Sequence, residues 1–144
     1  MKVLLDTNVI MDALQERQPF DTEANDIFLR AQNDEFICCI TANAVADVFY
    51  LCRRARDLKS ARQLLSFLLT SYKILSITHE DCIYAMSIPI EDFEDALVSA
   101  CAEKAEADYI ISRDDMFLRG NSPVKVIEPK DFLKIITGTT GNRA

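Results

Sequence analysis

Short apolar runs alternate with amphipathic stretches along most of this chain. The uninterrupted apolar runs predict five buried strands, at residues 2–5, 36–40, 72–77, 109–111 and 124–127. Between them, apolar residues recur at helical spacing and predict helices at residues 8–15, 22–33, 42–55, 58–71, 79–87, 92–106 and 129–136. Strands that alternate with helices indicate an α/β fold, in which a parallel sheet is covered by helices on both faces.

The pattern predicts one domain without internal repeats or linkers. A chain of 144 residues fits one domain and is long enough to bury a sizeable core. We assign residues 1–136 to this domain and expect residues 137–144, which are mostly small and polar, to form a disordered tail. No apolar run approaches the ~18 residues of a membrane span, and the start of the chain turns acidic too early for a signal peptide. We therefore expect a cytoplasmic protein that does not bind membranes.

Composition argues against several common kinds of site. With three glycines, the chain has neither a dinucleotide-binding motif nor a P-loop. Its five cysteines are odd in number and lack C-x-x-C spacing, and there is one histidine, so buried thiols are favoured over disulfides or zinc. The net charge of −7 argues against broad, non-specific binding of nucleic acids. It is compatible with a nuclease, because a carboxylate cluster is acidic until a metal neutralises it.

Four aspartates fall where a parallel sheet gathers its functional groups. Asp6 directly follows the first strand, and Asp114 lies just past the fourth. Asp47 and Asp95 lie in the first halves of two predicted helices. Strand ends and the starts of the following helices share one edge of the sheet, so the four carboxylates can converge there. Such a set suits Mg²⁺ or Mn²⁺, which can activate a water and neutralise a phosphate, and it therefore indicates phosphodiester chemistry.

Each aspartate also has a purely structural interpretation. Asp6 suits a helix N-cap, and Asp114 suits a turn. Asp95, like Asp92 before it, lies near a helix start, where the helix dipole favours negative charge. Asp47 stands inside a helix among Ala and Val, and its alternative role is a solvated position on the helix surface. The functional interpretation depends on the combination of the four.

The segments around these aspartates resemble the motifs of PIN-domain proteins. The similar segments are Leu4–Ile10, Thr41–Asp47, Asp92–Leu97, Ala107–Asp114 and Val126–Leu133. Together they cover about residues 2–134, in the family's order. The resemblance implies a Mg²⁺- or Mn²⁺-dependent ribonuclease with a three-layer α/β/α fold around a five-stranded parallel sheet. Small PIN proteins of this length resemble VapC-type toxins, which are usually homodimers and are inhibited by an antitoxin protein.

The resemblance also implies roles for individual residues. The catalytic and metal-binding acids of the family match Asp6, Asp47, Asp95 and Asp114. Asn8 and Ser112 match polar positions beside the metal. The second acid is commonly Glu, and Asp47 is one methylene shorter, so this carboxylate can reach a metal through water. Asp92 competes with Asp95 for the third role; we prefer Asp95 because Ala and Leu follow it as in the family, which leaves Asp92 as an N-cap or supporting group.

Basic residues are concentrated in one segment, residues 53–62. Its cations are Arg53, Arg54, Arg56, Lys59 and Arg62. The segment begins about two helical turns beyond Asp47, so long Arg side chains can hold the phosphates that flank a scissile one. The alternative is a solvated helix junction with pairs inside the helices. Arg113 directly precedes Asp114 and is a further RNA-binding candidate.

A protein partner is suggested by apolar residues on more than one face of the helices within residues 22–33 and 42–71. These residues are Phe28, Leu29, Phe49, Tyr50, Leu68 and Leu69. An interface would explain them, and the alternative is that both faces are covered within the monomer.

Three functional hypotheses follow from the sequence. The leading one is an endoribonuclease that works with metal-activated water, as the toxin of a toxin–antitoxin pair. A second keeps the fold without effective catalysis, as an RNA- or protein-binding module, and Asp47 in place of Glu favours it. A third, a phosphotransferase with Asp6 as nucleophile, is disfavoured because the acid that such enzymes need two residues later is replaced by Asn8.

Overall fold

The central sheet has five parallel strands, as the apolar runs predict. The computed structural model describes residues 1–141. Its strands are β1 (Lys2–Leu5), β2 (Ile37–Thr41), β3 (Lys73–Leu75), β4 (Tyr109–Ile111) and β5 (Val126–Ile127). They are arranged in the order β3-β2-β1-β4-β5, and every neighbouring pair is parallel. β1 is therefore the central strand, with two strands on either side.

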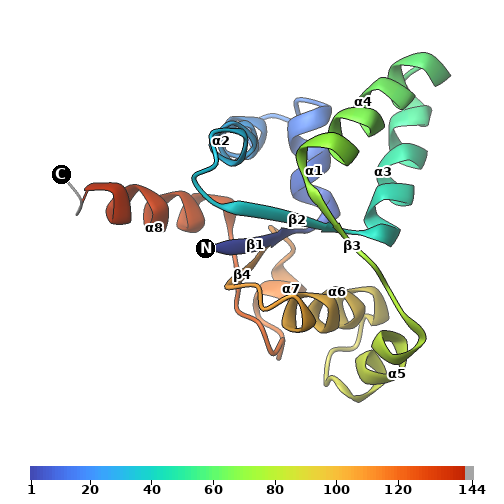
Figure 1. Ribbon diagram of the computed structural model, residues 1–144, viewed down its shortest axis with the longest axis vertical. Coiled ribbons are helices and arrows are strands. Elements are labelled where there is room, and N and C mark those ends of the chain that lie inside the picture. Colours follow the sequence, from blue (N-terminus) through green and yellow to red (C-terminus); the bar gives the residue numbers. More distant parts are fainter. Residues whose placement is uncertain (142–144) are drawn as a thin grey trace.

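Helices cover both faces of the sheet and make a three-layer α/β/α fold (Figure 1). The helices on one face are α1 (Thr7–Leu14), α2 (Asp21–Gln32), α3 (Ala42–Ala55) and α4 (Leu58–Ser71). The helices on the other face are α5 (His79–Ser87), α6 (Phe93–Lys104) and α7 (Asp115–Leu118). The last helix, α8 (Pro129–Gly141), contacts α2.

The alternation of side chains along β1 explains the two faces. Val3 and Leu5 point into the core that α1 to α4 and α8 cover, whereas Leu4 points into the core under α6 and α7. All three side chains are fully or almost fully buried. A strand buried on both faces reads as a continuous apolar run, which is why β1 was predictable without alternation.

The predicted elements differ from the observed ones mainly at the C-terminal end. The short helix α7 was not predicted, because four residues are too few to show a helical period. The last helix was predicted to end at Ile136 but runs to Gly141, through Gly138. Glycine is a poor helix former, and its presence suggested an earlier end. Of the tail predicted at 137–144, residues 142–144 lie outside the described residues.

The cysteines are mostly buried thiols, as expected from composition. All five cysteines are free, and four of them are buried. Each helix in residues 1–141 is too short or too polar to cross a bilayer.

The strand order produces a switch point between β1 and β4. From β1 the chain moves outward to β2 and β3, and it then returns to place β4 on the other side of β1. The helix that follows β1 lies on one face of the sheet, and the helix that follows β4 lies on the opposite face (Figure 1). In open α/β sheets, a ligand crevice forms at such a point, outside the carboxyl ends of the strands.

Candidate active site

Asp6 lies at the carboxyl end of β1, directly at this switch point. Its backbone N–H donates to the carbonyl of Ile111 in β4, at 2.9 Å. One carboxylate oxygen accepts the backbone N–H of Thr7 at 2.9 Å, which makes Asp6 the N-cap of α1. The other oxygen accepts the hydroxyl of Ser112 at 2.8 Å and the amide of Asn8 at 3.3 Å. The N-cap interpretation of Asp6 is therefore confirmed, and its role as a metal ligand stays a prediction.

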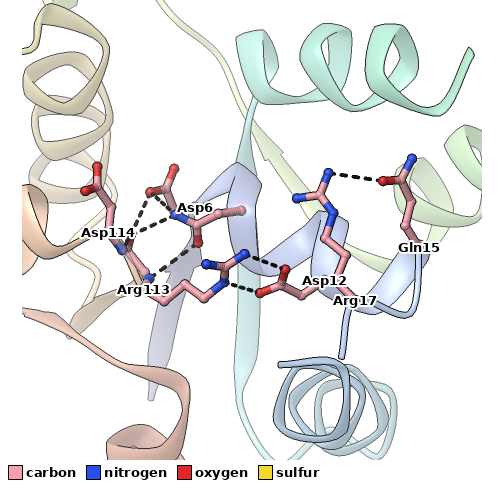
Figure 2. Close-up of polar contacts among 8 residues, drawn as sticks. Asp6, Asp12, Gln15, Arg17, Arg113 and Asp114 are labelled. Atoms are coloured by element: carbon pink, nitrogen blue, oxygen red, sulfur yellow. Dashed lines mark hydrogen bonds and ion pairs between the residues drawn. The ribbon is translucent and has the colours of Figure 1, made fainter. Parts of the chain in front are cut away.

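Ser112 connects the carboxyl ends of β1 and β4. Its side chain is fully buried, and its oxygen accepts the backbone N–H of Asp114 at 3.1 Å. The same oxygen accepts the amide of Asn8 at 3.2 Å, and the carbonyl oxygen of Asn8 accepts the backbone N–H of Arg113 at 3.4 Å. Figure 2 shows these contacts between the strand end at Asp6 and the turn at Arg113 and Asp114. Asn8 and Ser112, predicted as polar neighbours of the acids, hold Asp6 and the loop before Asp114 together.

Asp92 and Asp114 each begin a helix. Asp92 caps α6, where its side chain accepts the N–H of Asp95 at 3.2 Å. Asp114 caps α7, where its side chain accepts the N–H of Met116 at 3.1 Å. Asp92, Asp95 and Asp114 line one cavity of about 710 Å³. The predicted N-cap role of Asp92 is confirmed.

The electrostatics of the site connect these carboxylates. Burial, followed by the negative charges of Asp92, Asp6 and Asp114, raises the pKa of Asp95 to about 7. Burial also raises the pKa of Asp6, against the hydrogen bonds from Ser112 and Thr7 that lower it. The charges of Asp114 and Asp92 raise the pKa of Asp6 further. Carboxylates from three separate elements therefore act on one another, which is the condition under which a cation is attracted.

Asp47 reaches this group through Glu94, a residue that the sequence analysis did not single out. Burial raises the pKa of Glu94, and the charge of Asp47 and a hydrogen bond between the two carboxyls raise it further. The charge of Asp6 acts on Glu94 as well. The signal for Glu94 was its place between Asp92 and Asp95, in the first turn of a helix that starts at the edge where the acids gather.

The donor chemistry of the site suits a hard divalent cation, since every candidate ligand is an oxygen. Within residues 1–141, however, no three His, Cys, Asp or Glu side chains are arranged to hold one metal ion directly. Mg²⁺ usually keeps several of its waters, so a partly hydrated ion fits these carboxylates better than an ion enclosed by protein. Direct ligation by Asp6, Asp95 and Asp114 stays a prediction.

The sequence profile of the PIN domain matches residues 2–116. This chain belongs to the PIN-domain family. No curated protein matches it significantly.

Solved structures of similar fold include VapC toxins of the same family. VapBC2 from Rickettsia felis, bound to a DNA fragment from its promoter, has a TM-score of 0.68 at 17% identity, covering 89% of this chain and 98% of that one. Mycobacterium tuberculosis VapC20, a toxin that cleaves the sarcin–ricin loop, has a TM-score of 0.66 at 14% identity, with 80% and 92% covered. A toxin–antitoxin complex from Klebsiella pneumoniae has a TM-score of 0.66 at 21% identity, with 88% and 97% covered. Identities this low establish a shared fold.

The PIN domain engages Arg113 in a way that the sequence analysis did not foresee. Its Nε and one terminal nitrogen donate to the two oxygens of Asp12, at 2.6 Å and 3.0 Å (Figure 2). Asp12 is only 1% exposed, and the guanidinium also stacks 4.0 Å from the ring centroid of Phe20. The guanidinium is thus paired with a buried carboxylate within the fold, which gives Arg113 a structural role, and RNA binding by Arg113 stays a prediction.

The basic segment at the end of α3 makes mostly local contacts. Arg53 donates to the carbonyl of Arg56 at 3.0 Å, and Arg56 donates to the carbonyl of Leu14 at 3.3 Å. Arg54 lies 5.0 Å from the ring centroid of Tyr50. These contacts agree with the alternative of a helix junction, and RNA binding by Arg53, Arg54 and Arg56 stays a prediction.

The raised pKa of Asp95 predicts how the stability of the metal-free PIN domain depends on pH. The pKa rises from 3.8 to about 7 on folding, so between these values the folded protein binds more protons than the unfolded chain. The free energy of unfolding should therefore fall as pH rises through this window. Thermal unfolding in a chelator should show a lower Tm at pH 7 than at pH 5, and Asp95→Asn should reduce this difference. An equal pH dependence in both proteins would contradict the coupling of the carboxylates.

Proposed function

We propose that this PIN domain is a metal-dependent endoribonuclease that hydrolyses RNA phosphodiester bonds and acts as the toxin of a toxin–antitoxin pair. The observation that carries the proposal is the gathering of Asp6, Asp95 and Asp114 at the switch point between β1 and β4, where Ser112 bonds Asp6 and the N–H of Asp114, and where Asp95 and Asp114 line one cavity. Three carboxylates that repel one another at a ligand-binding edge are stabilised by a divalent cation. Membership of the PIN-domain family supports the same chemistry.

In the proposed site, the aspartates would hold the cation, and two polar residues orient one of these aspartates. Asp6, Asp95 and Asp114 would hold Mg²⁺ or Mn²⁺, with Asp47 acting through water or through its contact with Glu94. The bound cation supplies an activated water and neutralises phosphate charge. Ser112 and Asn8 orient Asp6 through hydrogen bonds of 2.8 Å and 3.3 Å, so its carboxylate needs no rearrangement when substrate arrives.

We further propose that the partners are an antitoxin protein and a second copy of this chain, in the cytoplasm where RNA substrate is present. The proposal is supported by the fold neighbours, which include toxin–antitoxin complexes. Of the apolar residues predicted for an interface, Leu29, Tyr50 and Leu69 are exposed on the helical layer, whereas Phe28 and Leu68 are buried in the core. The exposed subset is the part of the surface available to a partner.

The direct test is cleavage of a labelled single-stranded RNA by the purified protein. With Mn²⁺ or Mg²⁺ we expect internal cleavage, and with a chelator in excess we expect none, since the carboxylates alone repel the phosphate backbone. Re-addition of the metal should restore cleavage of the same bonds. Cleavage that persists in chelator, or an absence of cleavage at every metal concentration, would refute the proposal.

A metal titration separates the enzyme from the alternative, a catalytically weak module that binds RNA or protein. The shortness of Asp47 favours this alternative. A protein that binds the metal gains stability as ligand concentration exceeds Kd, by about 2.7 kcal/mol at a hundred times Kd. A Tm that rises with Mn²⁺ in the wild type, and less in Asp95→Asn, supports the metal site; the binding module predicts no metal-dependent rise.

A further inference from the structure

A cavity beside the acidic residues is also lined by apolar side chains and one basic side chain. The cavity has a volume of about 710 Å³, within the range of ligand-sized sites. Four acidic residues, Glu91, Asp92, Asp95 and Asp114, line the cavity, and two of them, Asp95 and Asp114, belong to the proposed catalytic centre. Ile90, Met116 and Arg119 also line it, so the cavity combines carboxylates with apolar surface and one cation.

Arg119 is the basic side chain that lines this cavity among the described residues. It follows α7 directly, is exposed, and its Nε donates to the carbonyl of Asp115 at 3.4 Å. No acidic side chain in residues 1–141 forms an ion pair with it. This distinguishes Arg119 from Arg113, whose guanidinium is held by Asp12. The terminal nitrogens of Arg119 are thus available for an anion, and phosphate matches guanidinium geometry well.

Met116 supplies an apolar surface next to this cation. Its side chain is 68% exposed although it directly precedes Phe117, which is buried. Met116 lines the same cavity as Ile90. Apolar side chains of this kind pack against the flat faces of nucleobases, and the flexible thioether adapts to different bases.

The spacing along α7 relates the acid and the cation to one strand of RNA. Asp114 precedes the helix and Arg119 follows it, five residues later, which corresponds to a helical rise of about 7.5 Å. Successive phosphates of a single RNA strand are joined through one ribose, so the distance between them is of the same order as this rise. A scissile phosphate at the carboxylates therefore leaves the next phosphate near Arg119.

We propose that this cavity is the subsite for the nucleotide that flanks the scissile phosphate, where Arg119 binds the neighbouring phosphate and Met116 packs against the base. This inference rests on the proposed cleavage of RNA. It names a cation that lies on the acidic edge itself, in contrast to the basic segment at the end of α3.

The kinetic test compares Arg119→Gln with Arg30→Gln, which removes the same charge from α2, on the opposite face of the sheet and outside the basic segment 53–62. On a short single-stranded RNA with Mg²⁺, Arg119→Gln should raise KM by about tenfold with little change in kcat. The dependence of binding on log salt should weaken by about one unit of slope. Arg119→Lys should recover part of the loss, because a point charge remains.

A second measurement does not depend on cleavage. Adenosine 3′,5′-bisphosphate serves as the probe, and the methyl resonance of Met116, assigned by its loss in Met116→Leu, reports occupancy in the presence of Mg²⁺. We expect a saturable shift of this resonance in wild type and Arg30→Gln, with affinity reduced by about tenfold in Arg119→Gln.

The two measurements separate failure of the subsite from failure of the ribonuclease. RNA cleavage with equal KM in Arg119→Gln and Arg30→Gln would overturn the subsite and leave the enzyme in place. A bisphosphate that shifts Met116 in an Arg119-dependent way, in a protein that cleaves no RNA, would support the subsite and refute the proposed activity. A probe that leaves the Met116 resonance unmoved would overturn the subsite.

Discussion

Asp6→Asn is expected to lower the rate of RNA cleavage by roughly 10³-fold, which corresponds to about 4 kcal/mol of transition-state stabilisation. Asn keeps the shape of the side chain, and its carbonyl can still accept the N–H of Thr7, so the cap of α1 is retained. The substitution removes the negative charge that would hold a cation and leaves Ser112 without a charged acceptor. Initial rates on a labelled single-stranded RNA, at saturating Mg²⁺ or Mn²⁺, measure the loss.

Asp115→Asn is the matched control for this prediction. Asp115 is exposed, directly follows Asp114 and opens the same short helix, so its substitution removes one charge near the site without touching the network around Asp6. Its cleavage rate should stay within about threefold of wild type, since an isolated surface charge acts through a screened field. Similar rates for Asp6→Asn and Asp115→Asn would overturn the central role of Asp6.

The largest expected effect on stability belongs to the ion pair between Arg113 and Asp12. Arg113→Met should lower the free energy of unfolding by about 3–5 kcal/mol, because it leaves a carboxylate buried without its partner. The two nitrogens of Arg113 contact the carboxylate at 2.6 Å and 3.0 Å, and Asp12 is 1% exposed. Asp12→Asn should cost less, since the Arg113 side chain is 30% exposed and water can reach it. Urea unfolding followed by circular dichroism measures both, because the chain has no tryptophan.

Two further variants distinguish this pair from an ordinary surface contact. Arg30→Met removes an Arg that pairs with Asp26 on the helix surface at 3.1 Å, and it should cost no more than about 1 kcal/mol. The double variant Asp12→Leu/Arg113→Met should recover most of the stability, as replacing a whole buried pair by apolar groups often does. If Arg113→Met lowers the free energy of unfolding no more than Arg30→Met does, the pair of Arg113 and Asp12 does not stabilise the fold as expected.

The secondary structure was largely predictable because each element repeats a local pattern. The five strands and all helices longer than one turn left a run or a period in the sequence. The exceptions have local causes as well. Helix α7 has four residues, which are too few to show a helical period. The predicted end of α8 was too early because Gly138 has a low helix propensity.

The proximity of Asp6 and Asp114 was predictable from the strand pattern. Both residues follow strands, and a parallel sheet brings the carboxyl ends of its strands to one edge. The role of Arg113 was not predictable. Its partner Asp12 lies 101 residues earlier, inside an apolar helix, and no local pattern announces a tertiary ion pair of that kind. The place of Arg119 beside the acids was not predicted either. The cavity that it shares with Asp92 and Asp95 is formed by the fold and leaves no pattern in the local sequence.

The position of β1 has a consequence for the time at which activity can appear. The serine that orients Asp6 is separated from it by 106 residues and is synthesised later, with β4. A nascent chain that ends before β4 has the first acid but neither Ser112 nor Asp114. The proposed RNA-cleaving centre is therefore incomplete until β4 and Asp114 have been synthesised, so most of this domain is translated before the proposed activity can act on RNA.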